Sequence, residues 1–291
     1  MKMAWLVVAL LLGQPATASY RAEIEKYRHE RLAELTAPNG WLAVRGLFWL
    51  KEGENSAGSD QSSAIRLPAR APKQIGVFTL KEGTVTFTAN SAASVVAGGK
   101  PVETYTFPAR GDERAGITVG GLTLFVLRRS DRIGLRLLDP ESVPRKTFPG
   151  LKYFPLDPAY RFKAKFVAYP ALKEVPVPNV LGQLVPMQSP GYVEFALNGR
   201  TYRLEPVYET AARNDLFFIF KDQTSRGGQT YEAGRFLHTP LPVDGVVDLD
   251  FNRAYNPPCA FTEFATCPLP VKENHLQVAI RAGELNYHLP K

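Results

Sequence analysis

The stretch that decides the fold class is YVEFALNGRTYRLEPV, residues 192–207. Apolar and polar residues alternate on both sides of Asn198-Gly199, as they do in half-buried antiparallel strands. An Asn-Gly pair readily adopts the positive φ angles of a two-residue hairpin turn. The stretch therefore predicts a β-hairpin with one strand at 192–197 and the next at 201–207.

The same alternation recurs along most of the chain after Trp41, with turns rich in glycine and proline between the runs. It predicts further strands at 41–50, 64–67, 76–80, 84–89, 102–107, 118–129, 133–138, 162–169, 216–220, 246–251 and 276–281. Helical periodicity does not recur between these runs, so parallel β-α-β units are not expected. We expect an all-β, mainly antiparallel protein.

The segment before Trp41 has a different period. Its apolar residues fall three or four positions apart between Tyr20 and Leu35, and charged residues lie between them. This spacing predicts an N-terminal amphipathic helix within residues 19–40, which ends near Pro38. The expected order after the helix is a β-sandwich at 41–139, a proline-rich connection at 140–160, and a second β-sandwich or barrel at 161–291.

Residues 1–18 have the pattern of a secretory signal peptide. Lys2 gives a positive start, residues 4–12 are apolar, and Ala16-Thr17-Ala18 fits the small-residue cleavage signature. The apolar run is shorter than a membrane-spanning helix requires, and no cysteine follows it for lipid attachment. We expect a protein that is exported to the periplasm or beyond, without a transmembrane anchor.

The charge of the chain is mildly basic. There are 35 Lys and Arg residues against 28 Asp and Glu residues, which gives a net charge of +7. The excess is spread along the sequence, whereas nucleic-acid-binding proteins gather basic residues on one face. We therefore expect a solvated basic surface, compatible with anionic substrates, and no nucleic-acid partner.

A second stretch, VDLDFNRAYNPPCAFTEFATCPL at residues 247–269, indicates where a site should lie. A strand runs into a loop that is dense in polar groups and stiffened by Pro257-Pro258, because proline fixes φ. Strand-end loops on a rigid scaffold often carry function. With two nearby segments, this loop supplies the candidate catalytic residues Asp222, Asp250 and Cys259, and the candidate binding residues Thr224, Tyr231, Arg235, Asn252, Tyr255 and Asn256.

Three functions fit these residues. Arg235 offers a planar fork for a carboxylate or phosphate, which favours a protein that binds a small anionic ligand or an envelope component. A hydrolase-type enzyme could use Asp222 or Asp250 as the base, with Asn256 or Arg235 stabilising developing negative charge. The third alternative is a structural or interaction module, in which these groups only lock the loop.

The two cysteines, Cys259 and Cys267, allow several readings. An oxidising compartment would let them form a disulfide. Alternatively Cys259 could be a nucleophile, if His238, His275 or His288 lay against it as a base. Zinc would need a fourth ligand beside Cys259, Cys267 and His275, and none is evident, so no metal or other cofactor is expected.

Several segments together resemble a bacterial family of domains of unknown function, numbered 1684. They lie at residues 41–50, 220–225, 231–237 and 250–261, and at Ala282-Gly283-Glu284. The most specific is YNPPCAF, residues 255–261. The family has no established activity, so the resemblance implies family membership and no reaction. In this family the position of His275 is usually another residue, which weighs further against zinc.

The first half of the chain is similar to a forkhead-associated (FHA) β-sandwich. The similarity lies in residues 53–60, 65–68 and 76–78 and in the turn Gly98-Gly99. FHA domains bind phosphothreonine through an arginine, a Ser-x-x-His-type segment and an asparagine turn. Here Ser59 follows Gly58, residues 72–75 replace the serine and histidine, and Gly98-Gly99 replaces the asparagine. The similarity implies a scaffold without phosphopeptide binding.

Overall fold

The computed structural model describes residues 16–109 and 115–287. Most of the predicted signal peptide, and also His288, lie outside the described residues. The described chain forms two compact units, each assembled from separated stretches. Residues 31–109, 115–150 and 258–267 make up the N-terminal unit, and residues 16–30, 151–257 and 268–287 make up the C-terminal unit.

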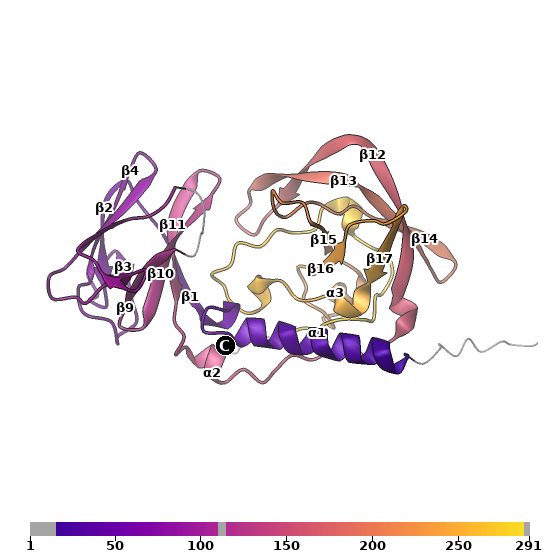
Figure 1. Cartoon of the computed structure of the whole chain (residues 1–291), viewed down its shortest axis with the longest axis horizontal. Coiled ribbons are helices and arrows are strands. Elements are labelled where there is room, and N and C mark those ends of the chain that lie inside the picture. Colours follow the sequence, from indigo (N-terminus) through magenta and orange to yellow (C-terminus); the bar gives the residue numbers. More distant parts are fainter. Residues whose placement is uncertain (1–15, 110–114, 288–291) are drawn as a thin grey trace, which may run out of the picture. The chain divides into compact units, whose positions relative to one another are not determined.

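The prediction of an all-β, mainly antiparallel protein with one N-terminal helix is confirmed (Figure 1). Helix α1 (Ala18–Thr36) begins and ends close to the predicted bounds. Two further helices are single turns, α2 (Val143–Lys146) and α3 (Gln223–Arg226). Short 3-10 turns lie at Trp41–Ala43, Pro158–Tyr160, Phe251–Arg253, Pro258–Ala260 and Lys272–Asn274.

The described part of the N-terminal unit contains two sheets. The six-stranded sheet has the order β1 (Val44–Trp49), β11 (Arg132–Leu138), β10 (Leu122–Arg129), β9 (Gly116–Val119), β6 (Val96–Ala97) and β7 (Lys100–Pro101). The five-stranded sheet has the order β3 (Ile65–Arg66), β2 (Gly53–Gly58), β4 (Gly76–Lys81), β5 (Thr84–Ala89) and β8 (Thr104–Thr106). Only β2 and β3, among the described strands, pair in parallel.

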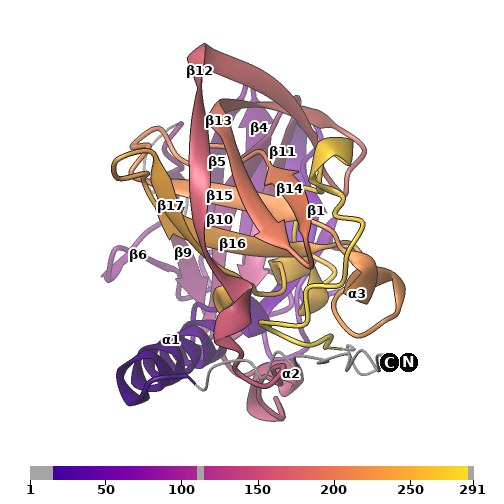
Figure 2. The same ribbon diagram turned by 90° about the vertical axis from the view of Figure 1, so that its right-hand side faces the viewer.

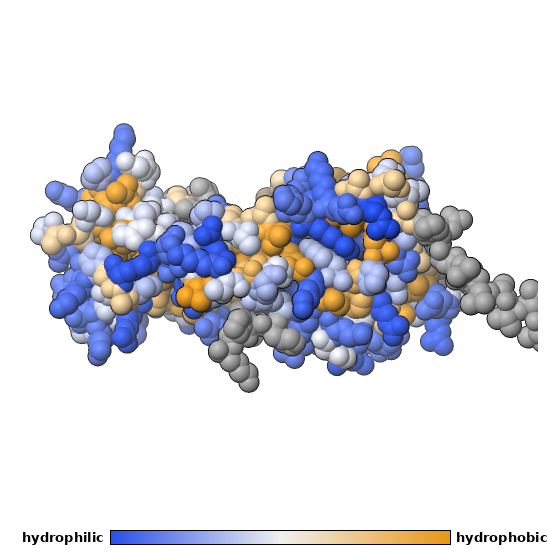
Figure 3. Space-filling view, turned by 90° about the horizontal axis from the view of Figure 1, so that it is seen from below, coloured by the Kyte–Doolittle hydropathy of each residue, from blue (hydrophilic) through white to orange (hydrophobic). Residues whose placement is uncertain are grey.

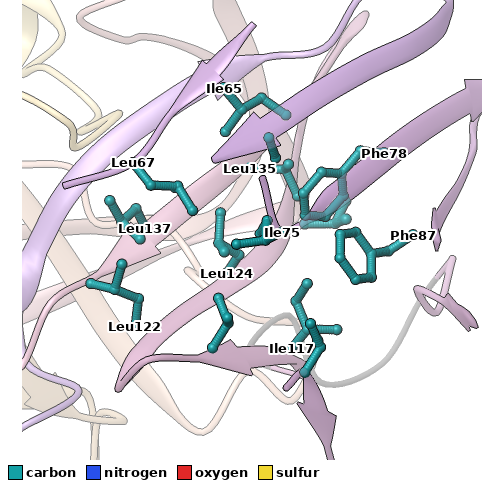
Figure 4. Packing of buried hydrophobic residues seen from close by; sticks show 14 of the residues in the cluster. Ile65, Leu67, Ile75, Phe78, Phe87, Ile117, Leu122, Leu124, Leu135 and Leu137 are labelled. Atoms are coloured by element: carbon teal, nitrogen blue, oxygen red, sulfur yellow. The ribbon is translucent and has the colours of Figure 1, made fainter. Parts of the chain in front are cut away.

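The core of this unit lies between the two sheets. Alternate residues of each strand point inward, so that Phe78 and Phe87 from one sheet meet Leu124 and Leu135 from the other (Figure 4). The two phenylalanine rings are 4.7 Å apart between centroids. This interdigitation of two inner faces is the arrangement of a β-sandwich.

The C-terminal unit is built on a bent sheet with the order β14 (Arg200–Leu204), β13 (Leu184–Leu197), β12 (Arg161–Pro178) and β17 (Val246–Asp250), as Figure 2 shows. A separate hairpin pairs β15 (Asp215–Phe220) with β16 (Arg235–Pro240). Leu216, Phe218 and Phe220 of the hairpin are fully buried against residues of the bent sheet and against Phe251, which follows β17. One face of the hairpin therefore completes the core, and its other face carries Asp215, Phe217 and His238.

The hairpin predicted at Asn198-Gly199 is present. Strands β13 and β14 pair from Leu197 with Arg200, and the two turn residues have φ angles of 53° and 72°. The predicted run at 118–129 is divided into β9 and β10 by a turn at Gly120-Gly121, whose φ angles are also positive.

The strand predicted at 276–281 is wrong. Its backbone makes only scattered bonds, with the Leu276 N–H donating to the Lys221 carbonyl and the Val278 carbonyl accepting from the Gln223 N–H. At Ile280 both backbone groups bond to buried side chains: the N–H donates to Asp222, and the carbonyl accepts from Arg235. The sequence analysis also missed β2, which contains two glycines, and β16, which begins with a charged residue.

Hydrophobic residues on the face shown in Figure 3 form small patches among hydrophilic ones. Such scattered exposure is normal for a folded protein surface. Within residues 16–109 and 115–287, no helix has the length and apolar character needed to cross a membrane.

Candidate functional site

The structure does not gather the predicted site residues into one site but distributes them over several places. Asp222, Thr224 and Arg235 lie together in the C-terminal unit, and Asp250 with Asn252 lies in a second buried network there. Asn256 belongs to a third network, and Tyr255 lies beside His238. Cys259 belongs to the N-terminal unit.

Arg235 and Asp222 form an ion pair that is closed to solvent. The Arg235 Nη2 is 2.8 Å from the Asp222 carboxylate, and both side chains are 0% exposed. Nη2 also donates to the Ile280 carbonyl at 2.9 Å, Nη1 donates to the Ala282 carbonyl, and the guanidinium lies over the Phe220 ring. Burial lowers the pKa of Arg235, while the Asp222 charge opposes this shift.

Asp222 has a second role as the N-cap of α3. One of its carboxylate oxygens accepts hydrogen bonds from the Thr224 N–H at 2.9 Å, the Thr224 hydroxyl at 2.5 Å and the Ser225 N–H at 3.3 Å. The other oxygen accepts from Arg235 and from the Ile280 N–H at 3.0 Å. Capping aspartates satisfy amides that a helix leaves open, and here the same carboxylate also fixes the segment that follows Leu276.

Asp250 ends β17 and meets the first turn of α1. The Tyr20 hydroxyl is 3.0 and 2.9 Å from its two carboxylate oxygens, and the Asn252 N–H and Nδ2 donate to it at 3.0 and 3.1 Å. Asn252 also exchanges hydrogen bonds with the backbone of Asp157. Burial raises the pKa of Asp250, although the donated hydrogen bonds oppose it, and burial together with the Asp250 charge raises the pKa of Tyr20.

Asn256 and Glu284 join the two long irregular segments of the C-terminal unit. The Asn256 N–H donates to Glu284 Oε2, and the Asn256 Nδ2 donates to the Leu285 carbonyl, both at 2.8 Å. Both side chains are fully buried. Tyr231 lies in the turn before β16, where its carbonyl accepts from the Gly234 N–H at 3.1 Å.

Tyr255 belongs to a stack of rings on the outer face of the β15–β16 hairpin. The His238 ring lies nearly parallel to the Phe217 ring, with centroids 4.6 Å apart, and nearly parallel to the Tyr255 ring at 6.1 Å. Phe236 meets Phe217 and Tyr255 edge-on. The imidazole therefore lies between two aromatic side chains, in a fixed orientation.

Two carboxylates complete this cluster. His238 Nδ1 is 2.6 Å from Asp215 Oδ2, and His238 Nε2 is 3.7 Å from Glu209 Oε2. These three side chains are 30%, 34% and 51% exposed, whereas those of Arg235 and Asp222 are closed to solvent. We call Glu209, Asp215, Phe217, His238 and Tyr255 the His238 surface.

From the sequence, His238 was expected only as a possible partner for Cys259, and Asp215 and Glu209 were not identified. Asp215 begins β15 and His238 lies within β16, and both are less buried than the apolar residues beside them. The register that pairs Phe217 with His238 is not visible in the sequence, because β15 and β16 are joined by a long segment that contains α3 and not by a short turn of defined type.

Cys259 and Cys267 lie together in the N-terminal unit as free thiols. The Cys259 N–H donates to the Cys267 sulfur at 3.2 Å. Their disulfide remains a prediction. No group of three or more His, Cys, Asp or Glu side chains with the arrangement of a metal site occurs within the described residues.

Comparisons with known proteins locate the chain in a family. An uncharacterized protein of Haloarcula marismortui, known from a solution NMR structure, is 32% identical over 49% of this chain and 79% of that chain, with a TM-score of 0.40. The FhaA FHA domain, solved in complex with the intracellular domain of Rv3910, is 16% identical over 32% of this chain and 94% of that chain, with a TM-score of 0.23.

A further FHA-domain structure, from work on phosphothreonine-dependent FHA domain interactions, has the same identity and TM-score and is covered over 92% of its length. The similarity to FHA domains is therefore weak. A search among curated proteins finds no match. Residues 146–285 match the model of a family described as protein of unknown function, DUF1684, which confirms the resemblance in the YNPPCAF segment. Through this region, the chain belongs to the DUF1684 family.

Proposed function

We propose that the protein is exported and binds a small ligand at the His238 surface. The signal-peptide pattern of residues 1–18 supports export. One observation carries the choice of site: the His238 surface combines a partly exposed histidine, two carboxylates and fixed aromatic rings. Rigid aromatic groups beside a few oriented polar groups are typical of small-molecule sites.

The geometry changes the class of ligand that we favour. An anion held by Arg235 would have to enter a buried position and displace Asp222 and two carbonyl groups from the guanidinium. The His238 surface instead carries the carboxylates of Asp215 and Glu209. These groups favour a ligand with an ammonium or guanidinium group, which could also lie against the face of an aromatic ring.

Native mass spectrometry of mature protein purified from its own cell envelope tests this proposal. We expect a mass surplus that is lost on denaturation, present in wild type and absent in His238→Ala. His275→Ala is the matched control, since His275 is also a half-buried histidine of the C-terminal unit and lies outside the His238 surface. An equal surplus in wild type and both variants would refute the assignment of the site, and a surplus mass that identifies an anion would refute the ligand class.

A hydrolase-type enzyme is the second candidate, and the Asp215–His238 pair favours it. A carboxylate 2.6 Å from Nδ1 orients the imidazole and leaves Nε2 as the proton acceptor. His238 would then be the base instead of Asp222, whose oxygens are already occupied by five donated hydrogen bonds.

This reading is tested with p-nitrophenyl esters as the probe. His238→Ala should abolish turnover, and Asp215→Asn should lower kcat and shift its pH profile, whereas His275→Ala should retain activity. Equal activity in all three variants would contradict an acid–base role of His238. If there is neither turnover nor bound ligand, the remaining interpretation is the structural or interaction module.

A further inference from the structure

The segment 258–267 covers the outer face of the six-stranded sheet in the N-terminal unit. Three side-chain contacts hold it there: the Thr262 hydroxyl donates to the Val44 carbonyl at 3.0 Å, Arg136 to the Phe264 carbonyl at 3.4 Å, and Arg129 to the Thr266 hydroxyl at 3.0 Å. The two cysteines lie at the two ends of this segment. The covering segment therefore brings two thiols together on a folded sheet.

The two sulfur atoms are close and differ in accessibility. The Cys267 sulfur accepts the Cys259 N–H at 3.2 Å. Cys267 is 5% exposed, whereas Cys259 is half-buried. A reagent in solution would thus meet Cys259 first, and Cys267 would react with it more slowly.

The pKa values of the two thiols are shifted in opposite directions, and this also makes Cys259 the more reactive of the two. The hydrogen bond from Cys267 lowers the pKa of the Cys259 thiol, although burial opposes this, and the positive charge of Arg136 acts in the lowering direction on both thiols. Burial raises the pKa of Cys267. Arg136 is itself held in place, with its guanidinium over the Trp41 ring at 5.0 Å. A thiolate is the reactive form of cysteine, so Cys259 is the more nucleophilic sulfur.

We propose that Cys259 and Cys267 form a reversible two-cysteine redox site, in which Cys259 reacts with an external disulfide and Cys267 closes the bridge. The Cys259 thiolate attacks one sulfur of the external disulfide, forms a mixed disulfide and releases one thiolate. Cys267 then loses its proton and attacks the Cys259 sulfur, which releases the second thiolate. Two electrons and two protons leave the protein, and the external disulfide is reduced to two thiols.

This site does not depend on the proposed ligand or on the His238 surface, because its residues belong to the other unit. It also differs from a cysteine nucleophile with a histidine base. The groups that act on Cys259 are a second thiol and an arginine.

The test is incubation of the folded, reduced protein with oxidised glutathione, followed by intact mass spectrometry. Wild type should lose two hydrogens and keep no glutathionyl group. Cys267→Ser should gain one glutathionyl group, because its mixed disulfide at Cys259 cannot be resolved. Cys259→Ser should react more slowly than Cys267→Ser, by about tenfold or more, since its only thiol is buried. In urea the two single variants should react at similar rates.

Arg136→Gln should slow the reaction of Cys259 at neutral pH, and Arg129→Gln is the matched control on the same face of the sheet. Circular dichroism shows which variants fold. If a variant does not fold, brief alkylation of wild type by iodoacetamide followed by peptide mapping reports which thiol is more reactive. We expect Cys259 to be labelled first. The proposal is overturned if oxidised wild type keeps both thiols, if it carries two glutathionyl groups, or if Cys267 is labelled as fast as Cys259.

Discussion

Replacing Arg235 by methionine should destabilise the C-terminal unit strongly, because Arg235 is fully buried and its guanidinium makes three hydrogen bonds. The variant leaves the Asp222 carboxylate buried without its cation. Breaking a buried pair in this way costs about 3–5 kcal/mol. The amide and hydroxyl groups that still donate to Asp222 offset part of this cost, so we expect about 3 kcal/mol, near the lower end.

Thermal unfolding followed by circular dichroism measures this effect. For a protein of this size each kcal/mol changes the Tm by about 2–4 °C, so the expected decrease is roughly 6–12 °C. The matched control is Arg203→Met, since Arg203 pairs with Glu194 at 2.8 Å while its side chain is 66% exposed. An exposed pair contributes about 0–1 kcal/mol, so the control should hardly change the Tm.

A double-mutant cycle with Asp222→Asn separates the ion pair from the lost packing of Arg235. The double variant should be more stable than the sum of the two single effects predicts, by about 1–3 kcal/mol, because neither charge is then left alone. A Tm of Arg235→Met equal to that of wild type, together with loss of a bound anion, would refute the structural role and restore Arg235 as a ligand-binding group.

Three further predictions concern pH, backbone geometry and redox state. Burial raises the pKa of Asp250 above its usual 3.8, so the protonated carboxyl stabilises the fold fully below the unfolded pKa, and this contribution is lost as pH rises through the folded pKa. Asp250→Asn should therefore flatten the pH dependence of the urea midpoint between these two pKa values. An unchanged slope would contradict this. Gly234→Ala should cost about 2 kcal/mol or more, because φ is +110° and the added Cβ would lie 2.6 Å from a backbone oxygen. The control Gly228→Ala, at φ +70° with no atom near the added Cβ, should cost about 1 kcal/mol. Equal urea midpoints for the two variants would show that the structure relaxes the close contact at Gly234. Closing a bridge between Cys259 and Cys267 should stabilise the N-terminal unit by about 2–3 kcal/mol, as the difference in Tm with and without reductant would show, and a lower Tm for the oxidised protein would mean that the bridge strains the segment.

The fold class was predictable because strand alternation and turn chemistry are local. The Asn198-Gly199 hairpin and helix α1 need no information from distant residues. The segment at 276–281 shows the limit of such patterns. It has the composition of a strand, but the side chains of Asp222 and Arg235 bond to the backbone groups of Ile280, and these side chains come from far away in the sequence.

The candidate site was predictable only in part, because residue type does not reveal burial. A structural role for these polar groups was one of the alternatives, but the sequence could not show that Arg235 and Asp222 are paired and closed to solvent. The contact of Tyr20 with Asp250 joins residues that are 230 positions apart. The Asp215–His238 pair depends on strand register, which is set by the whole sheet.

The placement of residues 258–267 has a consequence for how the chain folds as it is made. A polypeptide emerges from the ribosome N-terminus first, so residues 31–150 are made before their covering segment. Until then the outer face of the six-stranded sheet, with Phe125 and Leu138, lacks the contact with Phe264. A chain that stops before residue 258 therefore leaves these apolar side chains without that cover, where chaperones and proteases can recognise them.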